Sequence, residues 1–197
     1  MDSFQLRYAL LNSLPIFTAV CASDQLELLQ KQKSFAIIVN NEPSNKNGMH
    51  WICFFKDQNS DVIEFFDSYA MSITFYPVTV LNFCNAQAKH IRFNNIQFQS
   101  NWSDYCGHYC LWFLINRFYK GSFERTIKIF SRYNLIKNDK VVKDFVQQHF
   151  KFPEFSNCKL MCSDHEECVK NGVDLSSVCV QTSKCCTRLS NNLTKIY

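Results

Sequence analysis

The alternation of apolar and polar residues predicts short strands in the first half of the chain and helices mainly in the second half. Residues 3–13 are expected to form a short helix, and residues 35–39 (FAIIV) a strand that ends in the turn-rich segment NNEPSNKNG. Two further strands are expected at residues 50–55 (HWICFF) and 62–67 (VIEFFD). Strands followed mostly by helices indicate an α+β fold rather than an α/β fold.

The later part of the chain is expected to carry the main helices. Residues 106–119 (CGHYCLWFLINRFY) are apolar almost all round, which is typical of a buried helix. Amphipathic helices are expected near residues 123–133 and 141–150. Residues 90–93 and 96–99 are expected to be short extended pieces that lead into the loop SNWSDY.

Plain hairpin geometry is expected to bring an imidazole to a carboxylate. The loop KDQNSD between the two later strands is polar and contains no strand former, so an antiparallel hairpin is expected. If the hairpin closes symmetrically, Phe55 pairs with Val62, and His50 then lies directly opposite Asp67. Directly opposed residues have Cα atoms about 5 Å apart and side chains on one face. We therefore expect His50 and Asp67 to contact each other.

Cys106 is the candidate nucleophile, because a thiol reacts as its thiolate and the amide dipoles at the first turn of a helix favour that form. Gly107 follows it and is expected to keep side-chain bulk away from the amide that a substrate carbonyl would approach. Gln99, seven residues before Cys106, can donate to the oxygen of a tetrahedral intermediate. Together with His50 and Asp67, these residues fill the roles that Cys/His catalysis requires.

Each of these residues also has a structural interpretation when it is taken alone. A single His on a strand is more often a hydrogen-bonded structural residue, and an Asp at a strand end is usually a cap or turn former. A buried helical Cys is mostly a small hydrophobe, which is the interpretation for Cys110 and Cys53. The joint occurrence of all four roles favours the catalytic interpretation.

Other residues compete for some of these roles. Four of them could replace a candidate if the register or the loop differed: Asp57, Asp61 or Glu64 for the acid, and Gln97 for the amide donor. His90 and His108 are expected to be structural, because His108 lies two positions beyond the nucleophile on the same helix and faces away. Trp51 is expected on the opposite strand face from His50, packed around the site, and is a candidate substrate-binding residue together with Gly107.

The segments HWICFFKDQNSDVIEFFDSY and QSNWSDYCGHYCLWFL resemble the two active-site blocks of adenain, the adenovirus-type cysteine endopeptidase of clan CE, whose wider relatives include the SUMO-specific Ulp proteases. The family order of His, acid, Gln and Cys is matched. So are the seventeen-residue step from His to acid and the seven-residue step from Gln to Cys, which is one longer than is usual in the Ulp branch. FAIIVNNEPSNKNGMHW resembles the strand and loop before the family's His-Trp, and VVKDFVQQHFKFPEF resembles its late helix. The resemblance covers residues 14–155.

This resemblance implies a papain-like clan CE fold, with a central mixed sheet and the nucleophile at the N-terminus of a buried helix. It implies an enzyme of DNA viruses or virus-like transposons that cleaves capsid or other precursor proteins at glycine-containing sites, with no required cofactor. Family analogy leaves a DNA or peptide activator open. In adenovirus enzymes a second cysteine links the activating peptide, and Cys84 lies in the corresponding region but at a different sequence distance from Cys106. Asp67 stands where those enzymes have Glu, and Asp is the commoner acid in the wider clan.

Two other functions stay open at this point. One is a Ulp-type protease specific for SUMO or ubiquitin-like proteins, which the step from Gln to Cys disfavours. The other is an inactive binding module with the same groove, which the complete four-residue set disfavours. For the viral-type enzyme we expect a location in the host cytoplasm or nucleus, or packaging in virions.

Composition and charge add a domain boundary. The chain has 197 residues, a formal net charge of +4 and 11 cysteines, a charge balance that permits weak DNA binding without indicating it. A shift in composition near residue 156 divides a peptidase domain (1–156), expected to retain activity by itself, from a Cys-rich tail (157–197). Neither a signal peptide nor a membrane-spanning segment is expected.

The tail contains six of the cysteines: Cys158, Cys162, Cys168, Cys179, Cys185 and Cys186. They could form disulfides, or the segment could stay reduced and disordered. A zinc site is the third alternative, although its spacing fits no standard zinc finger well; its ligands would be Cys158, Cys162, His165 and Cys168. The family pattern does not include this tail.

Overall fold

A five-stranded mixed sheet forms the centre of the computed structural model, which describes residues 1–29 and 31–152. Its strands are β1 (Phe17–Ala22), β2 (Phe35–Asn40), β3 (Trp51–Lys56), β4 (Val62–Phe66) and β5 (His90–Phe93), and they lie side by side in this order. β1 is parallel to β2 and β4 to β5, whereas β3 is antiparallel to both of its neighbours. The predicted α+β fold with a central mixed sheet is confirmed.

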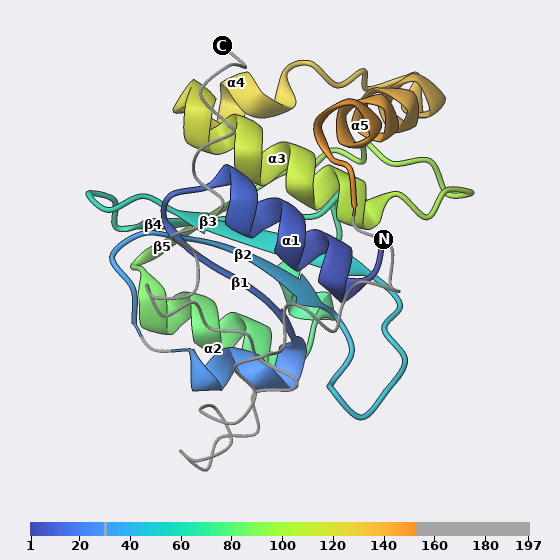
Figure 1. Ribbon diagram of the computed structural model, residues 1–197. Coiled ribbons are helices and arrows are strands. Elements are labelled where there is room, and N and C mark those ends of the chain that lie inside the picture. Colours follow the sequence, from blue (N-terminus) through green and yellow to red (C-terminus); the bar gives the residue numbers. More distant parts are fainter. Residues whose placement is uncertain (30, 153–197) are drawn as a thin grey trace.

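Helices lie on both sides of the sheet (Figure 1). They are α1 (Ser3–Ser13), η1 (Ser23–Leu28), η2 (Ile73–Phe75), α2 (Val78–Gln87), α3 (Cys106–Lys120), α4 (Phe123–Ile127) and α5 (Leu135–His149). α1 and α3 pack on one face, and α4 and α5 pack in turn on α3. α2 and η1 lie on the opposite face. The sheet is therefore the middle layer of three.

The central strand β3 contributes to two hydrophobic cores, because successive side chains of a strand point to opposite faces. Cys53 and Phe55 belong to the core that α1 and α3 complete. Ile52 and Phe54 belong to the core that α2 and η1 complete. All four side chains are buried. Burial on both faces explains why this strand is almost continuously apolar in the sequence.

The hairpin of β3 and β4 forms as predicted, but its register differs by two residues. Phe55 pairs with Glu64 and not with Val62, and the last pair before the loop is Lys56 with Ile63. Lys56 stays in the strand because its ammonium group donates to the carbonyl of Lys33 at 3.1 Å. The symmetric closure expected from the sequence is therefore wrong.

The shifted register does not separate the imidazole from the carboxylate. Continued beyond the ladder, it places His50 opposite Tyr69, so the expected direct opposition of His50 and Asp67 is wrong as well. An offset of two residues keeps side chains on the same face, because the side-chain period of a strand is two. Asp67 becomes a diagonal neighbour of His50, a position that long side chains still reach.

Three expected elements differ from the structure. The helix expected at residues 141–150 begins earlier, at Leu135, where the side chain of Asn134 caps it by accepting from the amide of Lys137. Residues 96–99 form no strand, because the amides of Phe98 and Gln99 both donate to the carbonyl of Ser68, at 2.9 and 3.1 Å, and not to a ladder. The helix expected at residues 123–133 ends early, at Ile127. The chain then turns around Ser131, whose amide donates to the side chain of Asn138 at 2.8 Å.

Among the described residues, no helix is long and apolar enough to cross a membrane. The boundary predicted at residue 156 and the cysteines after it lie outside the described residues, and the tail and its candidate zinc ligands stay predictions.

Candidate active site

The imidazole of His50 and the carboxylate of Asp67 form a buried pair. His50 directly precedes β3 and Asp67 directly follows β4, and the atoms His50 Nε2 and Asp67 Oδ1 are 2.7 Å apart. His50 is 8% exposed and Asp67 is 0% exposed. The ring of Tyr69 packs against the imidazole with its centroid at 5.0 Å, which limits rotation of the ring. Nε2 is thus committed to the acid, and Nδ1 is the nitrogen left for a second partner.

Four donors surround the carboxylate of Asp67. Oδ1 accepts from His50 and from the amide of Tyr69 at 3.0 Å. Oδ2 accepts from the amide of Met71 and from the hydroxyl of Tyr76, both at 2.8 Å. Burial favours the protonated acid, but the bonds from His50 and the other donors outweigh it and lower the pKa of Asp67. The acid is therefore held charged in one orientation.

Cys106 is the first residue of α3 and is 9% exposed. Burial favours the neutral thiol, yet a hydrogen bond to His50 and backbone hydrogen bonds from Trp51 and Gly107 lower its pKa. Burial likewise opposes charge on His50, but the bonds to Asp67 and Cys106 raise its pKa to about 9. These opposite shifts favour a thiolate beside an imidazolium, which is the reactive form of a cysteine nucleophile.

The neighbouring thiols behave differently. Burial raises the pKa of Cys110, one turn further along α3, and raises the pKa values of Cys21 and Cys84 to about 12. The thiol of Cys110 donates to the carbonyl of Trp51 at 3.4 Å. Cys110 therefore has the environment of a small hydrophobe, in contrast to Cys106.

Gln99 lies in the segment between β5 and α3 and is 0% exposed. Its Oε1 accepts from the hydroxyl of Ser68 at 2.6 Å. Its Nε2 donates to the carbonyl of Ser103 at 2.7 Å and to the hydroxyl of Tyr69 at 3.1 Å. Both amide hydrogens thus have partners in the free protein. A role as oxyanion donor stays a prediction, and it requires that one of these bonds be exchanged for a bond to substrate.

Gly107 lies beside α1 and the indole ring of Trp51. A Cβ on Gly107 would lie 3.3 Å from Leu6 and 3.4 Å from Met1 and from Trp51. The small residue therefore makes room for α1 and for the indole ring, and its role toward a substrate carbonyl stays a prediction. Trp51 packs on the core of α1 and α3, and its Nε1 donates to the carbonyl of Met1 at 3.3 Å.

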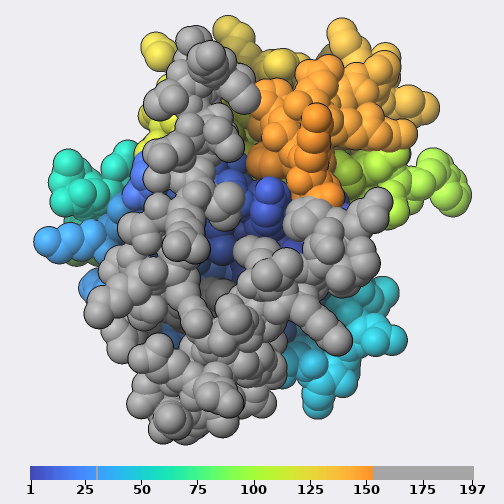
Figure 2. Space-filling view, viewed as in Figure 1, coloured from blue at the N-terminus to red at the C-terminus, as the bar shows by residue number. Residues whose placement is uncertain are grey.

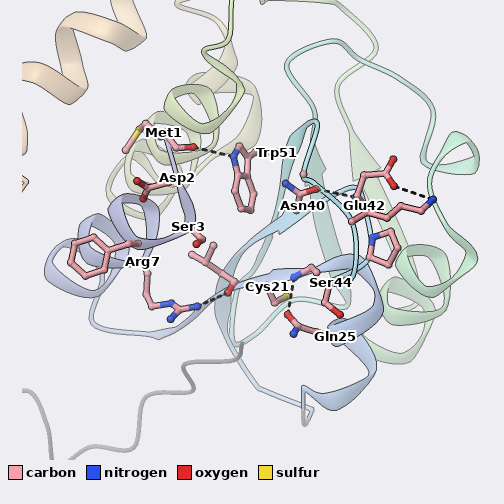
Figure 3. Close-up of a pocket in the computed structure, with 16 residues that line it drawn as sticks. Met1, Asp2, Ser3, Arg7, Cys21, Gln25, Asn40, Glu42, Ser44 and Trp51 are labelled. Atoms are coloured by element: carbon pink, nitrogen blue, oxygen red, sulfur yellow. Dashed lines mark hydrogen bonds and ion pairs between the residues drawn. The ribbon is translucent and has the colours of Figure 1, made fainter. Parts of the chain in front are cut away.

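Two hollows flank the loop of residues 41–49. The first, of about 490 Å³, lies between this loop and α1, and Figure 3 shows Trp51 in it with its indole nitrogen on the Met1 carbonyl. The second, of about 780 Å³, is lined by His50. A Cβ on Gly48 would overlap the side chain of Asn40, so glycine lets this loop pack down before it reaches His50. Figure 2 shows the loop and the green loop before α3 exposed on the same side of the molecule.

The competing residues have other partners. Glu64 binds the guanidinium of Arg117 at 2.6 and 3.1 Å in the buried layer between the sheet and α3. Asp61 pairs with Lys89 at 3.1 Å on the surface. Gln97 donates to the carbonyl of Gln99 at 2.8 Å and to the side chain of Asn101 at 2.7 Å. Asp57 is exposed in the hairpin loop. None of these four side chains takes the place predicted for Asp67 or Gln99.

Neither of the other two histidines considered as structural contacts the acid. His90 begins β5 and is exposed. His108 packs edge-on against Tyr105, with ring centroids 4.9 Å apart, and burial together with the nearby N-terminal charge lowers its pKa to about 4. Among the described residues, no cluster of three or more His, Cys, Asp or Glu could hold a metal ion.

Sequence reasoning missed the residues that hold the catalytic candidates in place. Tyr76 fixes the second oxygen of Asp67, and Ser68 and Tyr69 fix the amide of Gln99. The segment DSYA follows the acid directly and could have indicated a turn, which forms with the amide of Ala70 on the Asp67 carbonyl at 2.9 Å. No spacing in the sequence indicates Tyr76, because its contact depends on the path of η2.

Comparison with known proteins supports the fold. No family model and no curated protein matches the sequence. Among solved structures, the ASFV pS273R protease aligns with a TM-score of 0.55 and 17% identity over 78% of this chain and 68% of that chain. The Chlamydia trachomatis effector protein ChlaDUB1 aligns with a TM-score of 0.47 and 15% identity over 73% of this chain and 67% of that chain. The chain therefore shares the overall fold of the ASFV pS273R protease.

Proposed function

We propose that this chain is a cysteine endopeptidase that uses Cys106, His50 and Asp67 as a catalytic triad. The observation that carries the proposal is the buried His50–Asp67 bond of 2.7 Å. The thiol of Cys106, at the start of α3, interacts with the same imidazole and helps to raise its pKa. The pKa of the thiol is lowered and that of the imidazole is raised, and these opposite shifts favour the nucleophile and the proton donor that the reaction needs.

The proposed reaction has two steps. The thiolate of Cys106 attacks the carbonyl carbon, and a C–S bond forms while the developing oxyanion accepts from backbone amides and from Gln99. The C–N bond then breaks, and the imidazolium of His50 gives its proton to the leaving amine. In the second step His50 takes a proton from water, whose oxygen displaces the thiolate and releases the acid. Asp67 keeps the ring oriented throughout.

The proposed substrates are capsid or other precursor proteins cut at glycine-containing sites. This rests on the resemblance of the two active-site blocks to adenain, and the fold shared with the ASFV protease is compatible with it. We propose no required cofactor, and we leave activation by DNA or by a peptide as an option for the same class of enzyme. The corresponding location is the host cytoplasm or nucleus, or the virion.

The test uses a matched pair of cysteines on one helix. The full chain is incubated with a peptidyl vinyl sulfone ending in glycine and with the matching peptidyl coumarin. Cys106→Ala should lose both labelling and turnover, whereas Cys110→Ala should keep both. An adduct on Cys110 or Cys53, or turnover by Cys106→Ala, would refute the proposal. Coumarin derivatives of ubiquitin and SUMO serve as the third arm, and preference for either of them would favour the Ulp-type alternative.

A further inference from the structure

The hollow beside His50 has an unusually apolar rim. Met49 is 79% exposed, Phe75 is 74% exposed and Met71 is 43% exposed, and all three line the hollow of about 780 Å³. They come from two segments, the loop before β3 and the stretch after β4 that ends in η2. Large apolar side chains gathered on one exposed rim leave hydrocarbon surface in water, and such patches mark binding sites. The rim is therefore a candidate contact surface for substrate.

The position of the hollow relative to the reacting groups indicates which part of a substrate it receives. His50 lines the hollow, and so does Tyr76, whose hydroxyl binds the acid. In the proposed reaction the imidazolium gives its proton to the leaving amine, so the amine side of the scissile bond must lie next to this ring. The hollow is therefore on the side of the residues that follow the cleaved bond.

The chemistry of the lining indicates what kind of residue fits. Beside the two methionines and Phe75, the ring of Tyr69 and Pro77 also line the hollow. Apart from His50 itself, the charged groups there are Glu42 and Lys46 in the loop, which pair with each other at 3.6 Å. Methionine side chains adapt to irregular apolar shapes. The site thus suits a large apolar side chain better than a charged or small polar one.

We propose that this hollow is a subsite for the leaving part of the substrate and selects polypeptides with a large apolar residue, such as Leu, Met or Phe, directly after the scissile bond. The inference rests on the proposed peptidase activity and narrows it. A linear polypeptide presents such a residue at this place, whereas the isopeptide bond of a ubiquitin-like conjugate presents a lysine stem. The subsite therefore favours precursor processing over removal of ubiquitin-like proteins.

The first experiment measures cleavage by the full chain. Internally quenched peptides share one sequence up to the glycine of the scissile bond and carry Leu, Phe, Ser or Asp after it. We expect kcat/KM for Leu and Phe to exceed that for Ser and Asp by about tenfold or more. Phe75→Ser and Met49→Ser should each reduce this ratio severalfold. Their loss of kcat/KM should be larger on the Leu peptide than on a peptidyl coumarin, which has no amino-acid residue after the scissile bond. Ile136→Ser, an equally exposed apolar position on α5 (78%) outside the hollow, should leave the ratio unchanged.

The second experiment measures binding without turnover. Fluorescently labelled peptides that begin with Phe or with Ser, as leaving products would, are titrated against the Cys106→Ala chain. We expect the Phe peptide to bind at least fivefold more tightly, and Phe75→Ser in that background to abolish the difference. Equal binding together with equal cleavage of all four peptides would overturn the subsite while the peptidase stands. Selective binding by the Cys106→Ala chain, together with no cleavage of any peptide by the wild-type chain, would uphold the subsite and overturn the proposed activity. Neither selective binding nor cleavage would overturn both.

Discussion

Replacing Asp67 by asparagine separates the charge of the acid from its shape. The carboxylate accepts two hydrogen bonds on each oxygen. Asparagine keeps one acceptor oxygen and carries an NH2 group in place of the other, so one pair of donors must face another donor. If the amide oxygen stays with Met71 and Tyr76, Nε2 of His50 must accept and not donate. The ring then carries its proton on the nitrogen that should serve Cys106.

The size of the effect can be worked from the pKa of His50. Its partners raise that pKa from 6.5 to about 9, in spite of burial. This interval corresponds to about 3 kcal/mol in favour of the imidazolium. Losing most of it lowers the rate about a hundredfold, and a wrong tautomer in a triad lowers it up to about 10⁴-fold. We therefore expect Asp67→Asn to reduce kcat/KM by about 10² to 10⁴ at neutral pH.

The assay combines turnover of a glycine-terminated peptidyl coumarin with the pH dependence of Cys106 alkylation by iodoacetamide. In the variant, the pH at which the thiol becomes reactive should move up, since the imidazolium that stabilises the thiolate is lost. Asp61→Asn is the matched control, because its partner Lys89 is on the surface. Circular dichroism confirms that both variants are folded. Wild-type turnover and an unshifted alkylation profile in Asp67→Asn would refute the account of the acid.

Three further outcomes are expected. In a pH profile, kcat/KM should fall as the pH rises through about 9, because His50 then loses the proton that it gives to the leaving amine. The rise of kcat/KM on the acid side should lie below the ordinary pKa of a thiol, because the pKa of Cys106 is lowered. A rate that still rises above pH 9 would contradict this account. Glu64→Gln should lower the free energy of unfolding in urea by about 3 kcal/mol, since it leaves a buried arginine without its carboxylate. Asp61→Asn breaks an exposed pair and should lower the same free energy by less than about 1 kcal/mol. Equal losses in the two variants would show that the buried pair is not stabilising. Gly48→Ala should lower the free energy of unfolding by about 1 to 3 kcal/mol and reduce turnover, because the new Cβ would overlap a neighbouring asparagine and displace the loop before His50. Unchanged urea unfolding and unchanged kinetics would contradict the packing described for this loop.

Periodicity was sufficient to predict the elements that carry the candidate site. The strand that follows His50, the strand that precedes Asp67 and the helix that begins at Cys106 all lie where the pattern indicates, because each is buried on at least one face. α2 was missed, although Val80, Phe83, Cys84 and Gln87 are buried at helical spacing after Pro77. The β-branched and cysteine residues of α2 weaken the helical pattern. Pro at the helix start, taken together with the spacing of the buried residues, could still have indicated a helix.

Hairpin register could not be obtained from symmetry. The sequence offers no tight turn that would fix the pairing, and the choice depends on whether Lys56 can bury its stem and reach the carbonyl of Lys33, a contact between distant segments. The same holds for Gln99, whose amide hydrogens are bound by groups that only the folded loop brings near. Local patterns therefore indicated the candidate residues, and long-range contacts decide how each one is held.

The candidate site is assembled from both outer layers of the molecule. The thiol belongs to α3, on one face of the sheet, whereas Tyr76, which holds the acid, packs in the core on the other face. A chain in which only one layer has docked would have a nucleophile without an oriented base, or a base without a nucleophile. The proposed peptidase activity would then arise only at the end of folding, so that a nascent or partly unfolded copy could not cut the proteins around it.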